Sequence, residues 1–131
     1  MGVGKMRTKK DLKPFLRVDT KCGKLVFNRV VHDLLGEPPY FMFYWRKDKN
    51  ALYVAPQWEE TRHSFAIPAY VLKTKTRFEI LCYRQYLFED LQNRMNWKHG
   101  RVYKVYGTFD KIANMVWFQL DNMQMLEGID I

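Results

Sequence analysis

Short apolar runs separated by polar turns cover most of this chain, and their spacing predicts a protein built mainly of strands. The clearest unit begins at Gly23, which suits a turn with positive φ, and continues as a strand over residues 25–27. Apolar positions then recur at helical spacing as far as Leu35, which predicts a two-turn helix. Asn28 suits the N-cap of this helix because its side-chain oxygen can accept from the first amides, and Gly36 suits the left-handed position after the last turn.

A polar turn over residues 46–50 separates two strand-like runs, 40–45 and 51–55. This order of apolar and polar residues predicts a hairpin directly after the helix. The first unit of the chain is therefore predicted to be a strand, a short helix and a hairpin.

The second half of the chain has a similar order of patterns. It predicts a strand over 62–67 that ends at Pro68, an amphipathic helix over 87–95, and a second hairpin of 102–109 with 115–120. Residues 78–83 fit either a strand or the start of a long helix, because a short apolar run does not distinguish the two. We therefore predict the α+β class, mostly β, with two strand–helix–hairpin units.

The patterns and the distribution of charge divide the chain into four segments. These are a basic arm over 1–13, a first unit over 14–61, a second unit with an inserted helical segment over 62–122, and an acidic tail over 123–131. The arm carries five basic residues against one acidic residue and little to bury, so it is predicted to be flexible. Residues 62–111 carry ten basic residues against four acidic ones, the largest excess outside the arm.

Composition narrows the class of protein. The 131 residues suffice for one domain or for two small repeats that share a core. An apolar content of 47% excludes a disordered chain. A net charge of +8 suits polyanionic partners, such as nucleic acid or a membrane surface, and it equally suits ordinary solubility. No apolar run reaches the about 18 residues of a spanning helix, and the N-terminus lacks the apolar core of a signal peptide. We therefore expect no membrane association and a cytoplasmic protein in which Cys22 and Cys82 are reduced.

Side chains that carry catalysis in other proteins are scattered in this sequence. His32, His63 and His99 lie far apart, and no serine or cysteine stands in a nucleophile motif. The cysteines have no CxxC pair and no histidine at ligand spacing, which disfavours a zinc site. We therefore predict that the chain is not an enzyme, that it uses no metal or cofactor, and that His32 is a surface or helix-end residue.

The motif from Gly23 to Gly36 resembles that of the SpoVT/AbrB swapped-hairpin family of bacterial DNA-binding proteins. That motif is roughly Gly-Arg-aliphatic-x-aliphatic-Pro, then a few helical residues and Leu-Gly. Lys24 stands at the basic position, and Asn28 replaces the proline. Residues 64–72 repeat the aliphatic-Pro-x-x-x-Leu core without its glycine. The resemblance implies swapped-hairpin barrels, and two such units in one chain are similar to the MraZ-like arrangement.

In that family, basic residues of the first strand and turn contact DNA, which points here to Arg17, Lys21, Lys24 and Arg29. We therefore predict a transcriptional regulator that binds duplex DNA without catalysis and forms a homodimer. For these four residues, a solvated strand edge protected by charge is the alternative.

The aromatic residues keep other functions open. Residues 40–45 fit a buried core or an interface between subunits, and so do Tyr53, Tyr103, Tyr106, Trp117 and Phe118. A base-stacking platform needs exposed aromatic residues that alternate with basic ones on one face, and residues 103–106 have this pattern. The alternatives are therefore a single-stranded nucleic-acid binder and a protein-interaction module, such as an antitoxin or an inhibitor of a phage or mobile element.

Overall fold

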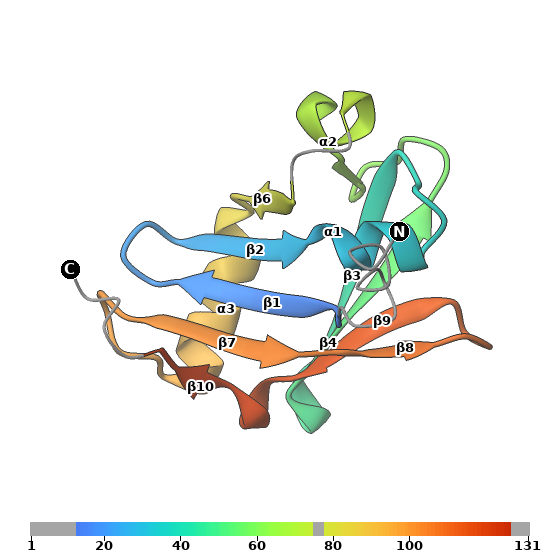
Figure 1. Cartoon of the computed structure of the whole chain (residues 1–131). Helices are drawn as coiled ribbons and strands as arrows, with labels where there is room; N and C mark the ends of the chain where they lie inside the picture. The colour runs from blue at the N-terminus through green and yellow to red at the C-terminus, as the bar shows by residue number, and fades with distance from the viewer. Residues whose placement is uncertain (1–12, 75–77, 127–131) are drawn as a thin grey trace, which may run out of the picture.

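The computed structural model describes residues 13–74 and 78–126, so the predicted arm 1–13 and the acidic tail 123–131 lie mostly outside the described residues. Figure 1 shows how the elements follow one another. They are β1 (Phe15–Asp19), β2 (Lys24–Asn28), α1 (Arg29–Leu34), β3 (Tyr40–Arg46), the 3-10 helix η3 (Lys47–Lys49), β4 (Ala51–Gln57), β5 (Phe65–Ala66), α2 (Ala69–Lys73), β6 (Glu79–Cys82), α3 (Gln85–Met95), β7 (Val102–Tyr106), β8 (Thr108–Asp110), β9 (Met115–Gln119), the 3-10 helix η4 (Leu120–Asn122) and β10 (Gln124–Met125).

The strands form two five-stranded antiparallel sheets. Sheet A has the strand order β10-β7-β1-β2-β6, and sheet B has the order β5-β3-β4-β9-β8. Both sheets combine strands from both halves of the chain, since β7 pairs with β1 and β9 pairs with β4. The predicted α+β class with mostly strands is confirmed. The division into units 14–61 and 62–122 stays a prediction.

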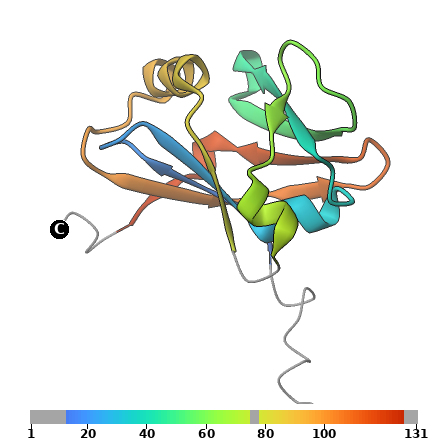
Figure 2. The same cartoon turned by 90° about the horizontal axis from the view of Figure 1, so that it is seen from above.

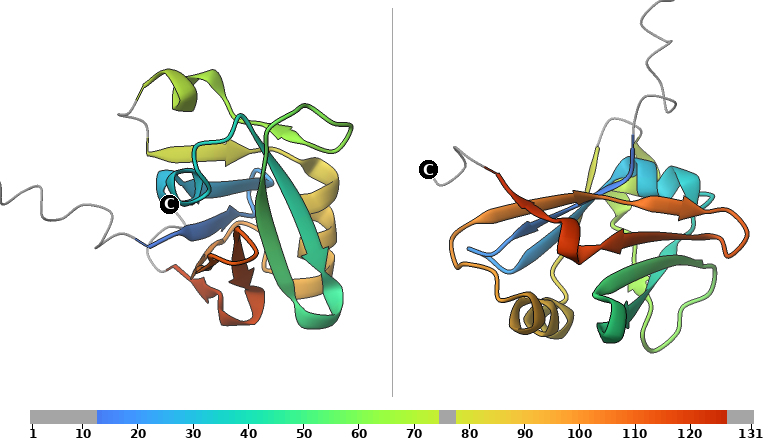
Figure 3. Two further views of the ribbon diagram at one scale, coloured as in Figure 1. Left: turned by 90° about the vertical axis from the view of Figure 1, so that its right-hand side faces the viewer. Right: turned by 90° about the horizontal axis from the view of Figure 1, so that it is seen from below.

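The core lies between the sheets and beneath α3. Alternation along β1 and β2 points every second side chain to one side of sheet A, and Leu16, Leu25 and Phe27 are fully buried there. Figures 2 and 3 show that α3 and the β3–β4 hairpin lie side by side over this same side. The opposite side of sheet A therefore forms an outer face.

The predicted first unit is confirmed as β2, α1 and the β3–β4 hairpin. Gly23 (φ 66°) and Gly36 (φ 88°) both adopt the positive φ that their places before the strand and after the helix require. In the hairpin, η3 forms the turn, and Asn50 (φ 51°) returns the chain to β4 in the left-handed conformation. The order of elements in this unit therefore agrees with the local pattern.

The open choice for residues 78–83 is decided by pairing with a distant strand. These residues form β6, which extends sheet A beside β2. The predicted amphipathic helix is confirmed as α3, where Leu91 is fully buried and Asn96 (φ 55°) ends the helix in the left-handed conformation.

Asn28 occupies the N-cap position of α1, but the prediction that its side chain caps the helix is wrong. Its Oδ1 accepts from Phe15 N at 2.9 Å, and its Nδ2 donates to Lys13 O at 2.7 Å. Since the chain turns into α1 here, the side chain continues the hydrogen bonding of β2 toward β1 beyond the last backbone pair. The first helical amide, Arg29 N, instead donates to Phe78 O at 2.7 Å.

Two predicted strands differ from the structure. The single strand predicted over 102–109 is divided at Gly107 into β7, which pairs with β1, and β8, which pairs with β9. Only the second part therefore forms the predicted hairpin. The strand predicted over 62–67 is shortened to β5, because Thr61 and Ser64 form a turn in which Thr61 N donates to Ser64 Oγ at 3.0 Å.

Changing Gly107 to Ala is expected to lower the free energy of unfolding by about 2–3 kcal/mol, as overpacking does. A Cβ at this position would lie 2.6 Å from Phe118 Cε1 and 2.9 Å from Trp117 O. The carbonyl belongs to a strand paired on both sides, so it cannot move freely. Urea denaturation measures the change. The control is Gly100→Ala, whose Cβ meets nothing within 4 Å and which adds only the strain of positive φ, about 1 kcal/mol. Equal losses in the two variants would contradict the packing explanation.

Candidate nucleic-acid interface

Thr20 joins the turn between β1 and β2 to the loop between α3 and β7. Its hydroxyl lies 2.9 Å from Lys98 O and 2.7 Å from Arg101 O, and it accepts a hydrogen bond from Arg101 N at 2.9 Å. Thr20 N also donates to Arg101 O at 3.0 Å, and the residue is buried. Two loops far apart in sequence therefore meet at one end of sheet A, as Figure 1 shows.

Basic residues continue from this end along the outer face of sheet A. Arg17 on β1 stands directly opposite Lys104 on β7. Lys24 on β2 belongs to the same face, because the alternation that buries Leu25 turns its neighbour outward. Like charges directly opposite each other destabilise a sheet, so this arrangement requires compensation.

Two contacts separate the opposed charges. Arg17 turns toward Glu79 on β6, with Nη1 2.6 Å from Oε2 and Nη2 3.1 Å from Oε1. Lys104 Nζ lies over two rings, 4.3 Å from the centroid of Phe15 and 4.9 Å from that of Tyr106. The guanidinium and the ammonium are thus stabilised by different partners, and both remain on the outer face.

We call this surface the basic edge and define it as Arg17, Lys21, Lys24, Lys98, Arg101 and Lys104. The acidic residues beside it are Asp19, Glu79 and Glu89, the last of which lines a hollow with Cys22 and Gly23. Six basic residues against three acidic ones leave a balance of +3. The hydrogen bond from Arg17 lowers the pKa of Glu79, and Lys24 and Lys104 lower it further, while burial acts in the opposite direction. Glu79 is therefore ionised at neutral pH, and the surface keeps its excess of positive charge.

The structure brings together three of the four predicted DNA-contacting residues. Lys21 is exposed, whereas Arg17 and Lys24 are half-buried on the outer face of sheet A. Arg29 does not lie with them. It is only 7% exposed, and its Nη2 donates to Val71 O at 2.6 Å, which connects α1 to α2.

Three members of the basic edge were missed by sequence reasoning, namely Lys98, Arg101 and Lys104. They follow the end of the glycine motif by more than 60 residues, and only the contacts of Thr20 and the pairing of β7 with β1 place them beside it. The signal that pointed to them was the excess of basic residues between 62 and 111.

Burial shifts the pKa of three further titratable side chains, His32, Cys22 and Cys82. Of the two positions predicted for His32, the helix end is confirmed, since it lies in the last turn of α1, and the surface is wrong, since the residue is buried. Its Nε2 lies 2.8 Å from Pro38 O, so this nitrogen carries the proton. Burial lowers the pKa of His32, and it raises that of Cys82 to about 11. Burial and the Asp19 carboxylate raise the pKa of Cys22. Among residues 13–74 and 78–126, no three potential ligands are close enough to hold a metal ion.

Within the part of the chain that the structure describes, no helix has the length and apolar character needed to cross a membrane.

Comparisons with known proteins identify no relative of this chain. Family models, curated proteins and solved structures all gave no match to this chain. The likeness of residues 23–36 to the SpoVT/AbrB family therefore rests on the sequence motif alone.

Proposed function

We propose that this protein binds duplex DNA without catalysis, through the basic edge, and acts as a transcriptional regulator. The observation that carries the proposal is the junction at Thr20, which places basic residues of the β1–β2 turn beside those of the α3–β7 loop. Sheet A adds Arg17 and Lys104 to the same end of the molecule. Three separate segments thus contribute to one positively charged surface.

The chemistry of this surface suits the phosphate backbone better than base edges. Lysine side chains are flexible point charges, and each phosphate that they neutralise releases condensed counterions. Arg17 is oriented by Glu79, so part of its charge is already balanced. We infer that Lys21, Lys24 and Lys98 make the main phosphate contacts.

The sequence motif around Gly23 also supports DNA binding. Its resemblance to the SpoVT/AbrB family associates this turn with DNA contact, and Lys24 stands at the family's basic position. We propose a swapped-hairpin relationship for the unit β2–α1 with its hairpin, and a homodimer as the binding form. Within one chain the large aromatic residues Phe27, Phe41 and Phe118 are already buried, so the dimer stays a prediction that light scattering tests.

A protein-interaction module remains the second candidate function. The observation in its favour is the set of large apolar side chains exposed on α3 and its flanks, Tyr83 (61% exposed) and Tyr86 (85%). Tyr83 lines a hollow together with Cys22 and Gly23 of the β1–β2 turn, so a protein partner bound there would lie beside the basic edge.

Changing Lys21, Lys24 and Lys98 together to Ala is expected to weaken duplex binding and to flatten its dependence on salt. Each phosphate contact contributes about −0.9 to the log–log slope, so three lost contacts change it by roughly 2.7. Fluorescence anisotropy with a labelled duplex between about 50 and 200 mM salt measures this slope.

The matched control changes Arg62, Lys73 and Lys111 to Ala. These exposed residues remove the same charge from loop 58–64, from α2 and from the β8–β9 turn. Unchanged binding by the control supports the basic edge. Equal losses in both triple variants would show general charge attraction, and an unchanged slope in the first would remove the proposed site.

A further inference from the structure

An aromatic row crosses the outer face of sheet B. Tyr44 on β3 stands opposite Tyr53 on β4, and Tyr53 stands opposite Trp117 on β9. Strand alternation separates this face from the core, because the neighbours Leu52 and Val54 are fully buried. Tyr44 is 46% exposed, and the other two rings of the row are half-buried.

The rings of the row lie nearly parallel where they meet. The centroids of Tyr53 and Trp117 are 6.0 Å apart, with an angle of 25° between the ring planes. Figure 2 shows sheet A on one side of the β3–β4 hairpin, and no described helix lies over the other side. Tyr53 and Trp117 are thus stacked on each other, and Tyr44 is the most exposed ring of the row among the residues that the structure describes.

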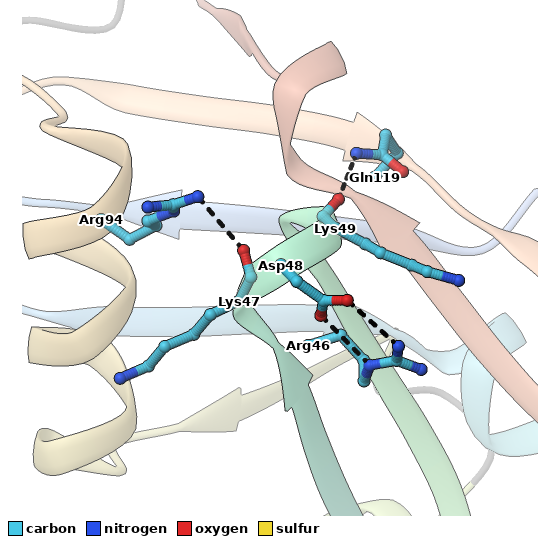
Figure 4. Close-up of polar contacts among 6 residues, drawn as sticks. All are labelled: Arg46, Lys47, Asp48, Lys49, Arg94 and Gln119. Atoms are coloured by element: carbon cyan, nitrogen blue, oxygen red, sulfur yellow. Dashed lines mark hydrogen bonds and ion pairs between the residues drawn. The ribbon is translucent and has the colours of Figure 1, made fainter.

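Cationic side chains surround the tip of the β3–β4 hairpin, two residues along the strands from the pair of Tyr44 and Tyr53. In Figure 4, Arg46 and Lys49 extend from one side of the tip, and Lys47 and Arg94 lie on the side of α3. Arg46 follows Tyr44 by two residues and shares its face of β3. The tip η3 adds Lys47 and Lys49, both exposed. Asp48 pairs with Arg46 at 3.3 Å, and Asp121 accepts from Asn50 Nδ2 at 2.9 Å. Four basic residues, counting Arg94 on α3, against these two acidic ones leave the tip a balance of +2.

Contacts from α3 and β9 hold the tip in place. Arg94 on α3 donates from Nε to Asn50 Oδ1 at 2.8 Å and from Nη2 to Lys47 O at 3.3 Å. Gln119 on β9 donates to Lys49 O at 2.8 Å. A fourth cation is thereby added to the tip, and the position of the tip beside the row is fixed from both sides.

Proteins that bind single-stranded nucleic acid combine exposed aromatic rings with positively charged side chains. Unpaired bases stack on aromatic rings, while the backbone follows a positively charged groove. Bases within a duplex are already stacked on each other, so the aromatic row does not gain stacking contacts with duplex DNA. We infer that the aromatic row with Arg46, Lys47, Lys49 and Arg94 binds single-stranded DNA, at a site separate from the basic edge. DNA is chosen as the polymer because the basic edge is proposed for it, and in this respect the inference rests on the proposed function.

Tyr44 is the residue to test because it is the most exposed ring of the row. Its change to Ala is expected to weaken binding of an oligo(dT) of about 12 nucleotides by about tenfold, as loss of one stacked base does. Tyr44→Leu keeps apolar bulk without a π face, so it should lose about as much, while Tyr44→Phe should bind like the unchanged protein. Tyr86→Ala removes an exposed ring outside the row and should have no effect.

The cations have a separate test. Arg46→Ala with Lys49→Ala should flatten the salt dependence of oligo(dT) binding by roughly 1.4 in log–log slope, since each contact with a single strand contributes about −0.7. Thermal unfolding of each variant verifies that the fold is intact. Wild-type affinity in Tyr44→Leu or in Tyr44→Ala would overturn the stacking site, and the face would then suit a protein partner. Binding of oligo(U) but not of oligo(dT) would overturn the assignment to DNA.

The two nucleic-acid proposals can fail separately. The triple variant of Lys21, Lys24 and Lys98 should keep oligo(dT) binding within about threefold, because its changes lie at the end of sheet A. If duplex binding is absent while Tyr44 still controls oligo(dT) binding, only the proposed function fails. If oligo(dT) binding disappears in the triple variant alone, the single-strand site is wrong.

Discussion

Replacing Phe27 with Ala is expected to lower the free energy of unfolding by about 3–5 kcal/mol, which is the range for aromatic residues in protein cores. Phe27 is fully buried on β2 and points from sheet A toward sheet B. Its ring centroid lies 5.6 Å from that of Phe43, 5.9 Å from that of Phe118 and 6.2 Å from that of Phe41. Truncation removes these contacts and leaves a cavity that the two sheets cannot close without losing their pairing.

Chemical denaturation in urea, followed by circular dichroism, measures this loss. Tyr86→Ala is the matched control, since its ring is 85% exposed on α3, and it should change the free energy of unfolding by less than about 0.5 kcal/mol. Phe27→Leu refills part of the space and should lose less than Phe27→Ala. A loss below about 2 kcal/mol for Phe27→Ala would show that the sheets rearrange around the cavity, against the packing described here.

Replacing Asn28 with Ala is expected to cost about 2–4 kcal/mol, more than the loss of an ordinary helix cap. The change leaves Phe15 N and Lys13 O without the partners that the amide provides. The bond from Phe15 N is buried, whereas Lys13 is exposed and the bond to its carbonyl is only partly buried. An unsatisfied buried amide costs about 1–3 kcal/mol, and loss of the second bond adds about 0.5–1.5 kcal/mol.

Two further variants identify the cause of that loss. Asn93→Ala on the exposed side of α3 removes the same side chain without a buried bond, and it should change stability by less than about 0.5 kcal/mol. Asn28→Asp keeps the acceptor for Phe15 N but faces Lys13 O with a second acceptor, so it should also destabilise the fold. If Asn28→Ala costs no more than Asn93→Ala, the side chain does not hold β1 to β2.

The sequence by itself determined the elements whose pattern is local. The unit from Gly23 to Gly36, the hairpin of β3 with β4 and the amphipathic helix α3 all follow from the spacing of apolar residues and from turn residues within a few positions. Helical periodicity, strand alternation and the positive φ of glycine depend on near neighbours along the chain. Such elements were predictable without knowing what they pack against.

Only the tertiary structure decided the features that depend on a distant partner. Residues 78–83 contain a strand because they pair with the edge of β2. The predicted strand 102–109 is divided because its two parts pair in different sheets. The preference of asparagine for helix N-caps predicts that Asn28 caps α1. Its side chain instead accepts a hydrogen bond from the backbone of β1. Local preference is weak beside the bonds that a tertiary neighbour supplies.

In the candidate site too, some residues were predictable from the sequence and others were placed only by tertiary contacts. Lys21 and Lys24 were found from the glycine motif, whereas Arg29, from the same motif, is turned into the interior by its bond to Val71 O. Lys98 joins the site only because Thr20 bonds to its loop. A charge has no preferred neighbour in the sequence, and it is the packing of strands and loops that sets which charges meet. The sequence thus determined that the chain carries an excess of basic residues, and the fold decided where they form one surface.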